Sequence, residues 1–150
     1  MAVDVKQIKK LREETGVSIA DCRRALEETN GNFEKATEWL KKQGLEKAAK
    51  KSDRETGQGL IESYIHQNGK VGVIVEILCE TDFVARTDDF KRLAHEVAMQ
   101  VAAMNPKDVD TLLKQDYIRD GSVTIENLVK QTIAKLGENI VIKEFKRLEI

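Results

Sequence analysis

The first 44 residues repeat apolar side chains at intervals of three and four, which is the spacing of one face of an amphipathic helix. Turn-forming residues, Gly16 and then Asn30-Gly31, divide this stretch into three such runs. The pattern predicts a module of three helices over residues 1–44, with the third helix ending at Gly44. The expected inner positions are Val5, Ile8 and Leu11; Ile19, Cys22, Ala25 and Leu26; and Phe33, Ala36, Trp39 and Leu40.

Residues 45–57 are rich in Lys and predict a partly helical linker. From residue 60 the apolar spacing changes to two, which is typical of strands. Ile61, Ser63 and Ile65 alternate with polar or aromatic neighbours, and Val71–Cys79 would place its odd-numbered residues on one face. Asn68-Gly69 lies between these two runs, which predicts an antiparallel hairpin with a type I′ turn.

Helical spacing returns after the second strand. A long helix is predicted over residues 82–104, a short one over 109–115 and another over 124–136, followed by a third strand over 139–148. The long helix would bury Phe90, Leu93, Val97, Val101 and Met104. The fold class expected for residues 58–150 is therefore α+β, with a three-stranded antiparallel sheet and helices on one of its faces.

Composition narrows the classes of function. The formal net charge is −1, which argues against general nucleic-acid binding, and the run Lys47–Lys51 has no accompanying aromatic residues, so we interpret it as a solvated connector. Cys22 and Cys79 lack the spacing of a metal site or disulfide framework, so buried, reduced thiols and no cofactor are expected. No apolar run is long enough to span a membrane and no leader pattern is present, which predicts a soluble, cytoplasmic protein.

An enzymatic function would have to use Cys79, His66, Asp82 or His95. No nucleophile elbow, phosphate-binding glycine loop or metal-spaced cluster accompanies them. Both histidines are interpreted as surface residues, and the protein is predicted not to be an enzyme.

The most informative stretch is Glu80–Arg86, where the second strand passes into the long helix. Thr81 or Asp82 can cap the orphan N–H groups of that helix, which would place Phe83 at a rigid corner. Residue type alone favours a Phe83 side chain that packs inward, because aromatic residues are usually buried. The alternative is a protrusion that inserts into a partner.

Two segments of the chain resemble the signatures of the elongation factor Ts family. Glu76–Arg86 resembles one signature and Leu11–Leu26 resembles the N-terminal one, in the order and at the separation that the family shows. The segments Gly44–Lys51 and Ile133–Ile140 also resemble family sequence. This chain departs from the family pattern at Leu78, where Asn is usual, at Arg23, where Lys is usual, and at Gln100, where many members have a His that contacts the partner.

The resemblance implies a guanine-nucleotide exchange factor for elongation factor Tu, which would bind both the GDP-bound and the nucleotide-free forms. It assigns docking to Arg12, Ile19 and Ala20, and contact beside the nucleotide to Thr81, Asp82, Phe83 and Val84, with Asp82 disturbing the partner's Mg²⁺. A competing interpretation takes the first 44 residues as a ubiquitin-associated-like binding module, which leaves Thr81–Val84 without a role.

The chain is short for this family and resembles a form with one half of the core. A single sheet would leave an edge or face that a second copy could cover, which predicts a homodimer through the α+β domain. Lys143, Lys146 and Arg147 on the last strand are, in contrast, charges that would keep an edge monomeric.

Overall fold

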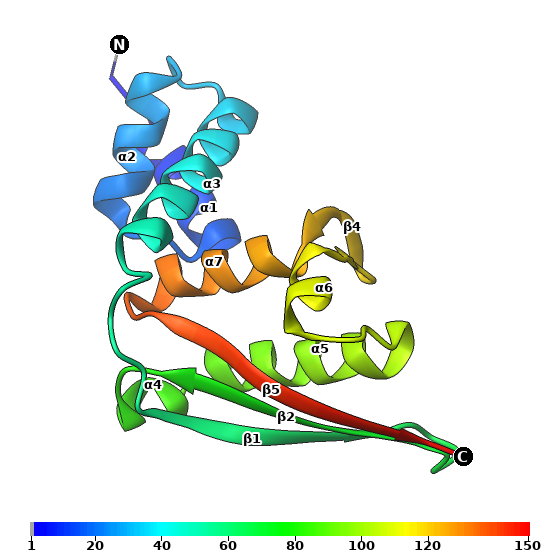
Figure 1. Cartoon of the computed structure of the whole chain (residues 1–150). Coiled ribbons are helices and arrows are strands. Elements are labelled where there is room, and N and C mark those ends of the chain that lie inside the picture. Colours follow the sequence, from blue (N-terminus) through cyan, green and yellow to red (C-terminus); the bar gives the residue numbers. More distant parts are fainter. Residues whose placement is uncertain (1) are drawn as a thin grey trace. The chain divides into compact units, whose positions relative to one another are not determined.

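The computed structural model describes residues 2–150, which divide into two units along the chain (Figure 1). The first unit ends at Lys47 and is helical; the second comprises Ala48–Ile150 and contains all the strands. The α+β class that the sequence predicts is confirmed.

The first unit contains helices α1 (Val5–Thr15), α2 (Ile19–Glu28) and most of α3 (Phe33–Lys50). Asp4 and Ser18 cap the first two helices through their side-chain oxygens, and Gly16 ends α1 in the left-handed conformation. The buried side chains come from all three helices: Ile8, Leu11, Cys22, Ala25, Leu26, Ala36 and Leu40. Val5 and Ile19 were expected inside, but both are more than half exposed.

The predicted end of the third helix at Gly44 is wrong, because α3 continues to Lys50. A glycine inside a helix costs only about 1 kcal/mol relative to alanine, and good helix formers follow it here. Lys47 forms an ion pair with Asp21 at 3.1 Å, and Ala48 is buried in the core of the second unit. The Lys-rich run is therefore part of a structured helix.

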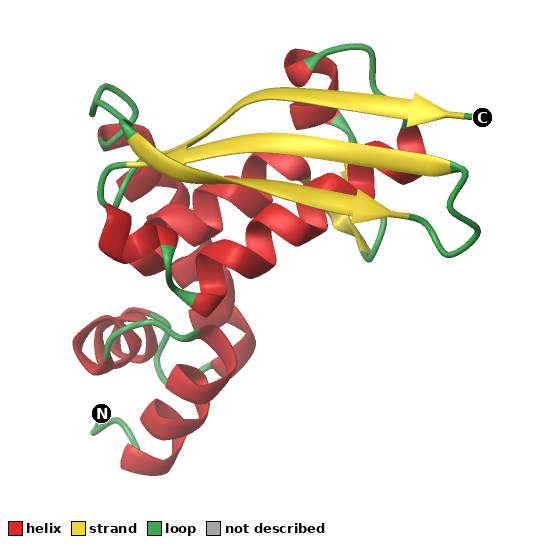
Figure 2. Cartoon of the chain, turned by 90° about the horizontal axis from the view of Figure 1, so that it is seen from below, coloured by secondary structure: helices red, strands yellow, loops and turns green. Residues whose placement is uncertain are grey.

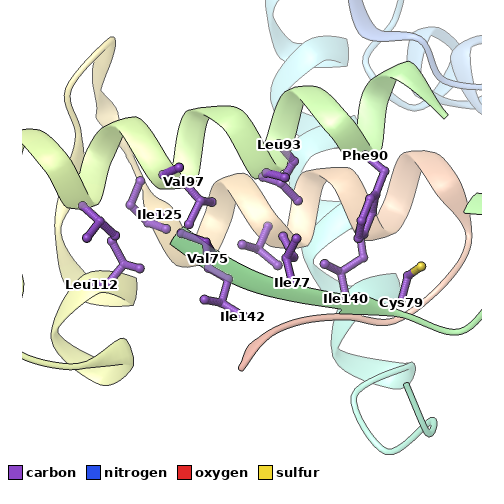
Figure 3. Packing of buried hydrophobic residues seen from close by; sticks show 14 of the residues in the cluster. Val75, Ile77, Cys79, Phe90, Leu93, Val97, Leu112, Ile125, Ile140 and Ile142 are labelled. Atoms are coloured by element: carbon purple, nitrogen blue, oxygen red, sulfur yellow. The ribbon is translucent and has the colours of Figure 1, made fainter. Parts of the chain in front are cut away.

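The second unit is built on an antiparallel sheet with the strand order β1 (Gln58–Ile65), β2 (Val71–Cys79), β5 (Ile140–Glu149). Its helices lie on one face of this sheet (Figure 2). Helix α5 (Asp88–Met104) packs against β1 and β2, and α7 (Ile125–Leu136) and α6 (Val109–Lys114) pack against β5. Alternation along β2 points Val73, Val75, Ile77 and Cys79 into this core, opposite Phe90, Leu93 and Val97 of α5 (Figure 3).

The hairpin of β1 and β2 is confirmed, but its turn is not of type I′. Such a turn needs positive φ at both central residues, and only Gly69 has it, with φ +70°. The amide of Gly69 donates to the carbonyl of His66 at 2.7 Å, so the turn is wider than predicted.

The long helix predicted over residues 82–104 is divided into α4 (Asp82–Ala85) and α5. Thr87 causes the break, since its hydroxyl accepts from the amide of Phe90 at 3.3 Å and donates to the carbonyl of Val84 at 2.7 Å. A second cap therefore starts a new helix, and Phe83 lies on a separate single turn.

A small hairpin that was not predicted lies between α6 and α7 and is formed by β3 (Asp116–Tyr117) and β4 (Asp120–Thr124). The Tyr117 hydroxyl donates to the Glu96 carboxylate on α5 at 2.7 Å. Burial and this neighbouring carboxylate raise the pKa of Tyr117 to about 12, so the hydroxyl stays protonated and continues to donate.

Candidate functional site

The corner between β2 and α4 presents an aromatic side chain to solvent. Thr81 has an extended backbone and caps α4, because its hydroxyl accepts from the amide of Val84 at 3.3 Å. Phe83 is 79% exposed, whereas Val84 and Ala85 are buried and hold the turn against the core. A shallow depression lies beside the exposed ring and is lined by Phe83, Arg86 and Thr87. Of the two alternatives for Phe83, the protrusion is the one observed in the structure.

The two neighbours of Phe83, Asp82 and Val84, are predicted site residues with different surroundings: Val84 is buried, and Asp82 is in an ion pair. Val84 is only 5% exposed, so it supports the corner from within and does not form its surface. Asp82 is exposed and pairs with Arg86 one helical turn later. An exposed pair of this kind contributes little to stability, so the Asp82 carboxylate can change partners at small cost.

The loop between α7 and β5, residues 137–139, contacts the corner between β2 and α4. The carboxylate of Glu138 accepts from the backbone N–H of Thr81 at 2.9 Å and from its hydroxyl at 2.7 Å. A second contact joins the same two segments: the carboxylate of Glu80, next to Thr81, accepts from the backbone N–H of Asn139 at 2.8 Å. The sequence analysis assigned no role to Glu138, because a residue 57 positions away from Thr81 gives no local signal.

Cys79 lies on the inner side of the same corner. Its thiol donates to the carbonyl of Thr81 at 3.1 Å. Burial, together with the nearby negative charge of Glu138, raises the pKa of the Cys79 thiol, so it stays protonated and remains a donor. Its role in the structure is to hold the backbone of the corner.

The other predicted site residues lie on the surface of the first unit. Arg12 is in the last turn of α1, and Ile19 and Ala20 open α2 after the short connection at Gly16. All three are exposed, and Ile19 is 55% exposed although it is a large aliphatic residue. They provide a basic and apolar surface of the kind that protein partners contact.

Gln100 is completely buried and has a structural function in this chain. Its side-chain amide donates to the carbonyl of Asp116 at 3.0 Å and to the Gln115 side chain at 3.3 Å, and its oxygen accepts from the amide of Ile118 at 3.0 Å. These bonds fix the β3–β4 hairpin to α5. Gln100 is therefore not part of the exposed surface of this chain.

Residues 2–150 contain no group of three or more His, Cys, Asp or Glu side chains placed to hold a metal ion. Among the helices of these residues, none has both the length and the apolar character needed to cross a membrane.

Two family models match the chain, and together they include every predicted site residue. The model described as "Elongation factor Ts, mitochondrial, N-terminal" matches residues 1–48, and the model described as "Elongation factor TS" matches residues 80–150. Elongation factor Ts of Fervidobacterium nodosum is 42% identical over 195 aligned residues, which include 100% of this chain and 99% of that relative. The chain belongs to the elongation factor Ts family. The resemblance found in the sequence is confirmed.

Other members of the family match over nearly the whole chain. Elongation factor Ts of Nitratidesulfovibrio vulgaris is 40% identical, with 100% of this chain and 98% of the relative covered. The chloroplastic elongation factor Ts of Guillardia theta is 42% identical, with 99% and 89% covered. The alignment to the Nitratidesulfovibrio protein extends over 195 positions against 150 residues here, so that relative has segments without a counterpart in this chain.

Proposed function

We propose that this protein is a guanine-nucleotide exchange factor that binds elongation factor Tu and promotes GDP release during translation elongation. The observation that carries the proposal is the exposed Phe83 at a rigid corner, in a chain of the elongation factor Ts family. The protein would make and break no covalent bond, and it would act in the cytoplasm, where elongation takes place.

Phe83 is the residue with which the factor would displace the nucleotide. Burial of a phenylalanine side chain in a partner's pocket contributes about 1.5–3 kcal/mol. This corresponds to a change of roughly ten- to over a hundredfold in an equilibrium constant. Because the ring is already exposed in the free factor, this free energy is available on binding without any unfolding of the factor.

The mechanism is thermodynamic linkage between two ligands of the GTPase. A factor that prefers the nucleotide-free form weakens nucleotide binding by the same free energy by which nucleotide weakens the binding of the factor. GDP is held through its phosphates and Mg²⁺, so Asp82 placed near the metal would disturb the ion's surroundings while Phe83 displaces the adjoining structure. Asp82 can leave Arg86 for this purpose at small cost.

Arg12, Ile19 and Ala20 would dock the first unit on the GTPase domain. Their exposure supports this assignment, because it leaves the Ile19 side chain accessible for burial against a partner. Docking would supply affinity, and the corner of the second unit would supply the displacement. The factor would bind both the GDP-bound and the nucleotide-free forms.

The test of this proposal is the release of fluorescent GDP from elongation factor Tu in an excess of unlabelled GDP. We expect the release rate to rise with the concentration of this protein and to reach a plateau of at least about ten times the spontaneous rate. Tight binding to elongation factor Tu with no acceleration would contradict the proposal.

We further propose that the uncovered face of the sheet pairs with a second copy of the chain. Some of the side chains on this face are apolar, and five large apolar ones are exposed to solvent: Ile61, Ile65, Ile74, Val141 and Leu148. The same face carries charges of both signs, Glu76 and Glu144 with Lys146. A surface with both signs can complement itself across a two-fold axis, which supports a homodimer.

A further inference from the structure

Glu138 uses both oxygens of its carboxylate on one residue, Thr81. One oxygen accepts from the backbone N–H of Thr81 at 2.9 Å, and the other accepts from the Thr81 hydroxyl at 2.7 Å. Gly137 ends α7 with a left-handed backbone (φ 78°), and this places Glu138 next to the corner as the chain turns into β5. The carboxylate is therefore directed at a single residue, the cap of α4.

The Thr81 hydroxyl connects this carboxylate to the helix that carries Phe83. The hydroxyl donates to Glu138 and accepts from the amide of Val84 at 3.3 Å. A hydroxyl that donates to a charged acceptor becomes a better acceptor itself. Helix α4 has four residues, and so short a helix has little stability of its own. Its conformation is held by the buried Val84 and Ala85 and by the cap, and Glu138 accepts two hydrogen bonds from the capping residue.

The loop that carries Glu138 is itself anchored. The Asn139 side-chain amide donates to the carbonyls of Ser52 at 3.3 Å and Arg54 at 2.9 Å, and Asn139 is buried. Its backbone N–H donates to Glu80, which also pairs with Arg54 at 3.5 Å. Glu80 thus holds the loop, and Glu138 holds the corner. This reciprocal pair of contacts fixes the position of the corner relative to β5.

We propose that Glu138 is a positioning residue for nucleotide exchange: it holds the cap of α4 so that Phe83 is presented in one conformation before the GTPase is met. The inference rests on the proposed function above. A preorganised side chain avoids the entropic cost of being ordered during binding, and this raises the fraction of encounters in which it can insert.

The test compares Glu138→Gln with Glu126→Gln in the full-length protein. Glutamine keeps the size of the side chain but replaces one acceptor oxygen with a donor, so it cannot accept from both the N–H and the hydroxyl of Thr81. Glu126 is an exposed carboxylate at the other end of α7, where it pairs with Lys130. It therefore controls for the same change in charge.

For Glu138→Gln we expect the maximum rate of GDP release from elongation factor Tu to fall by about tenfold, because a hydrogen bond to a charged acceptor is lost. The concentration needed for half of that maximum should stay within about twofold, because the docking surface is untouched. Glu126→Gln should match the wild type in both quantities. An unchanged maximum rate for Glu138→Gln, or an equal fall for Glu126→Gln, would overturn the inference.

Two further measurements separate positioning from a general loss of structure. Hydrogen exchange of the free protein should show faster exchange for residues 81–84 in Glu138→Gln, with the core of α5 unchanged. Uniformly faster exchange over the second unit would overturn the inference. In a protein that already carries Thr81→Val, Glu138→Gln should reduce the maximum rate less than it does in the wild type. An equal reduction in the two proteins would overturn the inference.

These outcomes are distinguishable from a failure of the proposed function. If the wild type did not accelerate GDP release, the exchange function itself would be wrong. The inference fails on its own if the wild type accelerates GDP release and Glu138→Gln accelerates it equally.

Discussion

Phe83 and Phe90 are the same residue type seven positions apart, and their surroundings are opposite. Phe83 is 79% exposed and Phe90 is 0% exposed. In one continuous helix, residues seven apart lie on nearly the same face, so both rings would point into the core. The break at Thr87 separates the two helices and frees Phe83 to point outward. The cap at Thr87 thus lies between an exposed and a buried phenylalanine.

The proposed effect of Asp82 on exchange is that of a single charge. Asp82→Asn keeps the size of the side chain and removes the charge, so we expect catalysed GDP release to slow by about fivefold, which corresponds to the roughly 1 kcal/mol of an exposed charge pair at 4 Å. Complex formation should change little. Stopped-flow GDP release at several Mg²⁺ concentrations measures the effect, and Asp88→Asn, an exposed acid in the first turn of α5, is the matched control. Equal rates for wild type and Asp82→Asn at every Mg²⁺ concentration would reject a role for the charge.

The residues of the site differed in how far the sequence could predict them. Thr81 was predictable as a cap, because an oxygen-bearing side chain at the start of a helix is a local signal. The exposure of Phe83 was left open, because its residue type favours a buried ring whereas its place beside a helix cap allows a protruding one. The role of Glu138 could not be predicted, because its contact with Thr81 exists only once β5 lies beside β2.

At the scale of elements, the sheet was predictable and the helix break was not. The alternation of apolar and polar side chains predicts β1 and β2 as strands. A third strand was expected because an isolated two-stranded hairpin is only marginally stable in water. Thr87 with Asp88 and Asp89 is the pattern of a helix N-terminus, but the predicted helix over residues 82–104 ran through these residues without a break. The β3–β4 hairpin is short and depends on the buried Gln100 amide, a tertiary contact without a local pattern.

The pairing of β1 with β2 depends on Gly59. A Cβ atom there would lie 2.1 Å from the carbonyl oxygen of Ile77, and the backbone has φ +152°. Gly59→Ala should therefore push β1 away from β2 and lower the free energy of unfolding by about 2 kcal/mol or more. Gly57→Ala, where the added atom would meet nothing within 4 Å, should be nearly neutral. Equal urea midpoints for the two variants would show that β1 adjusts without cost.

At the scale of the whole molecule, the two units have different proposed tasks. Ile19→Ser should raise the factor concentration needed for half-maximal GDP release by about tenfold, because it removes an apolar contact of roughly 1.5 kcal/mol, and should leave the maximum rate unchanged. Val5→Ser is the matched control, since Val5 is also an exposed aliphatic residue of the first unit but is not a predicted docking residue. A lower maximum rate with unchanged half-maximal concentration would show that the first unit acts in displacement.

The proposed homodimer gives a second prediction for the whole molecule. Sedimentation equilibrium at micromolar concentration should give twice the chain mass of 16.9 kDa. Ile74→Lys, in the centre of the uncovered sheet face, should give the mass of one chain, while Ile118→Lys, an exposed isoleucine outside that sheet, should leave the dimer intact. A wild type of 16.9 kDa with full exchange activity would mean that one copy suffices.

The proposed exchange function depends most on Phe83, so the decisive measurement is the maximum rate of GDP release from elongation factor Tu with Phe83→Ala. We expect this rate to fall at least about tenfold, because the buried phenylalanine side chain is worth roughly 1.5–3 kcal/mol in the complex. The melting temperature should hardly change, because a side chain that is 79% exposed leaves no cavity when it is shortened. A variant that melts many degrees lower but exchanges normally per folded molecule would contradict the account.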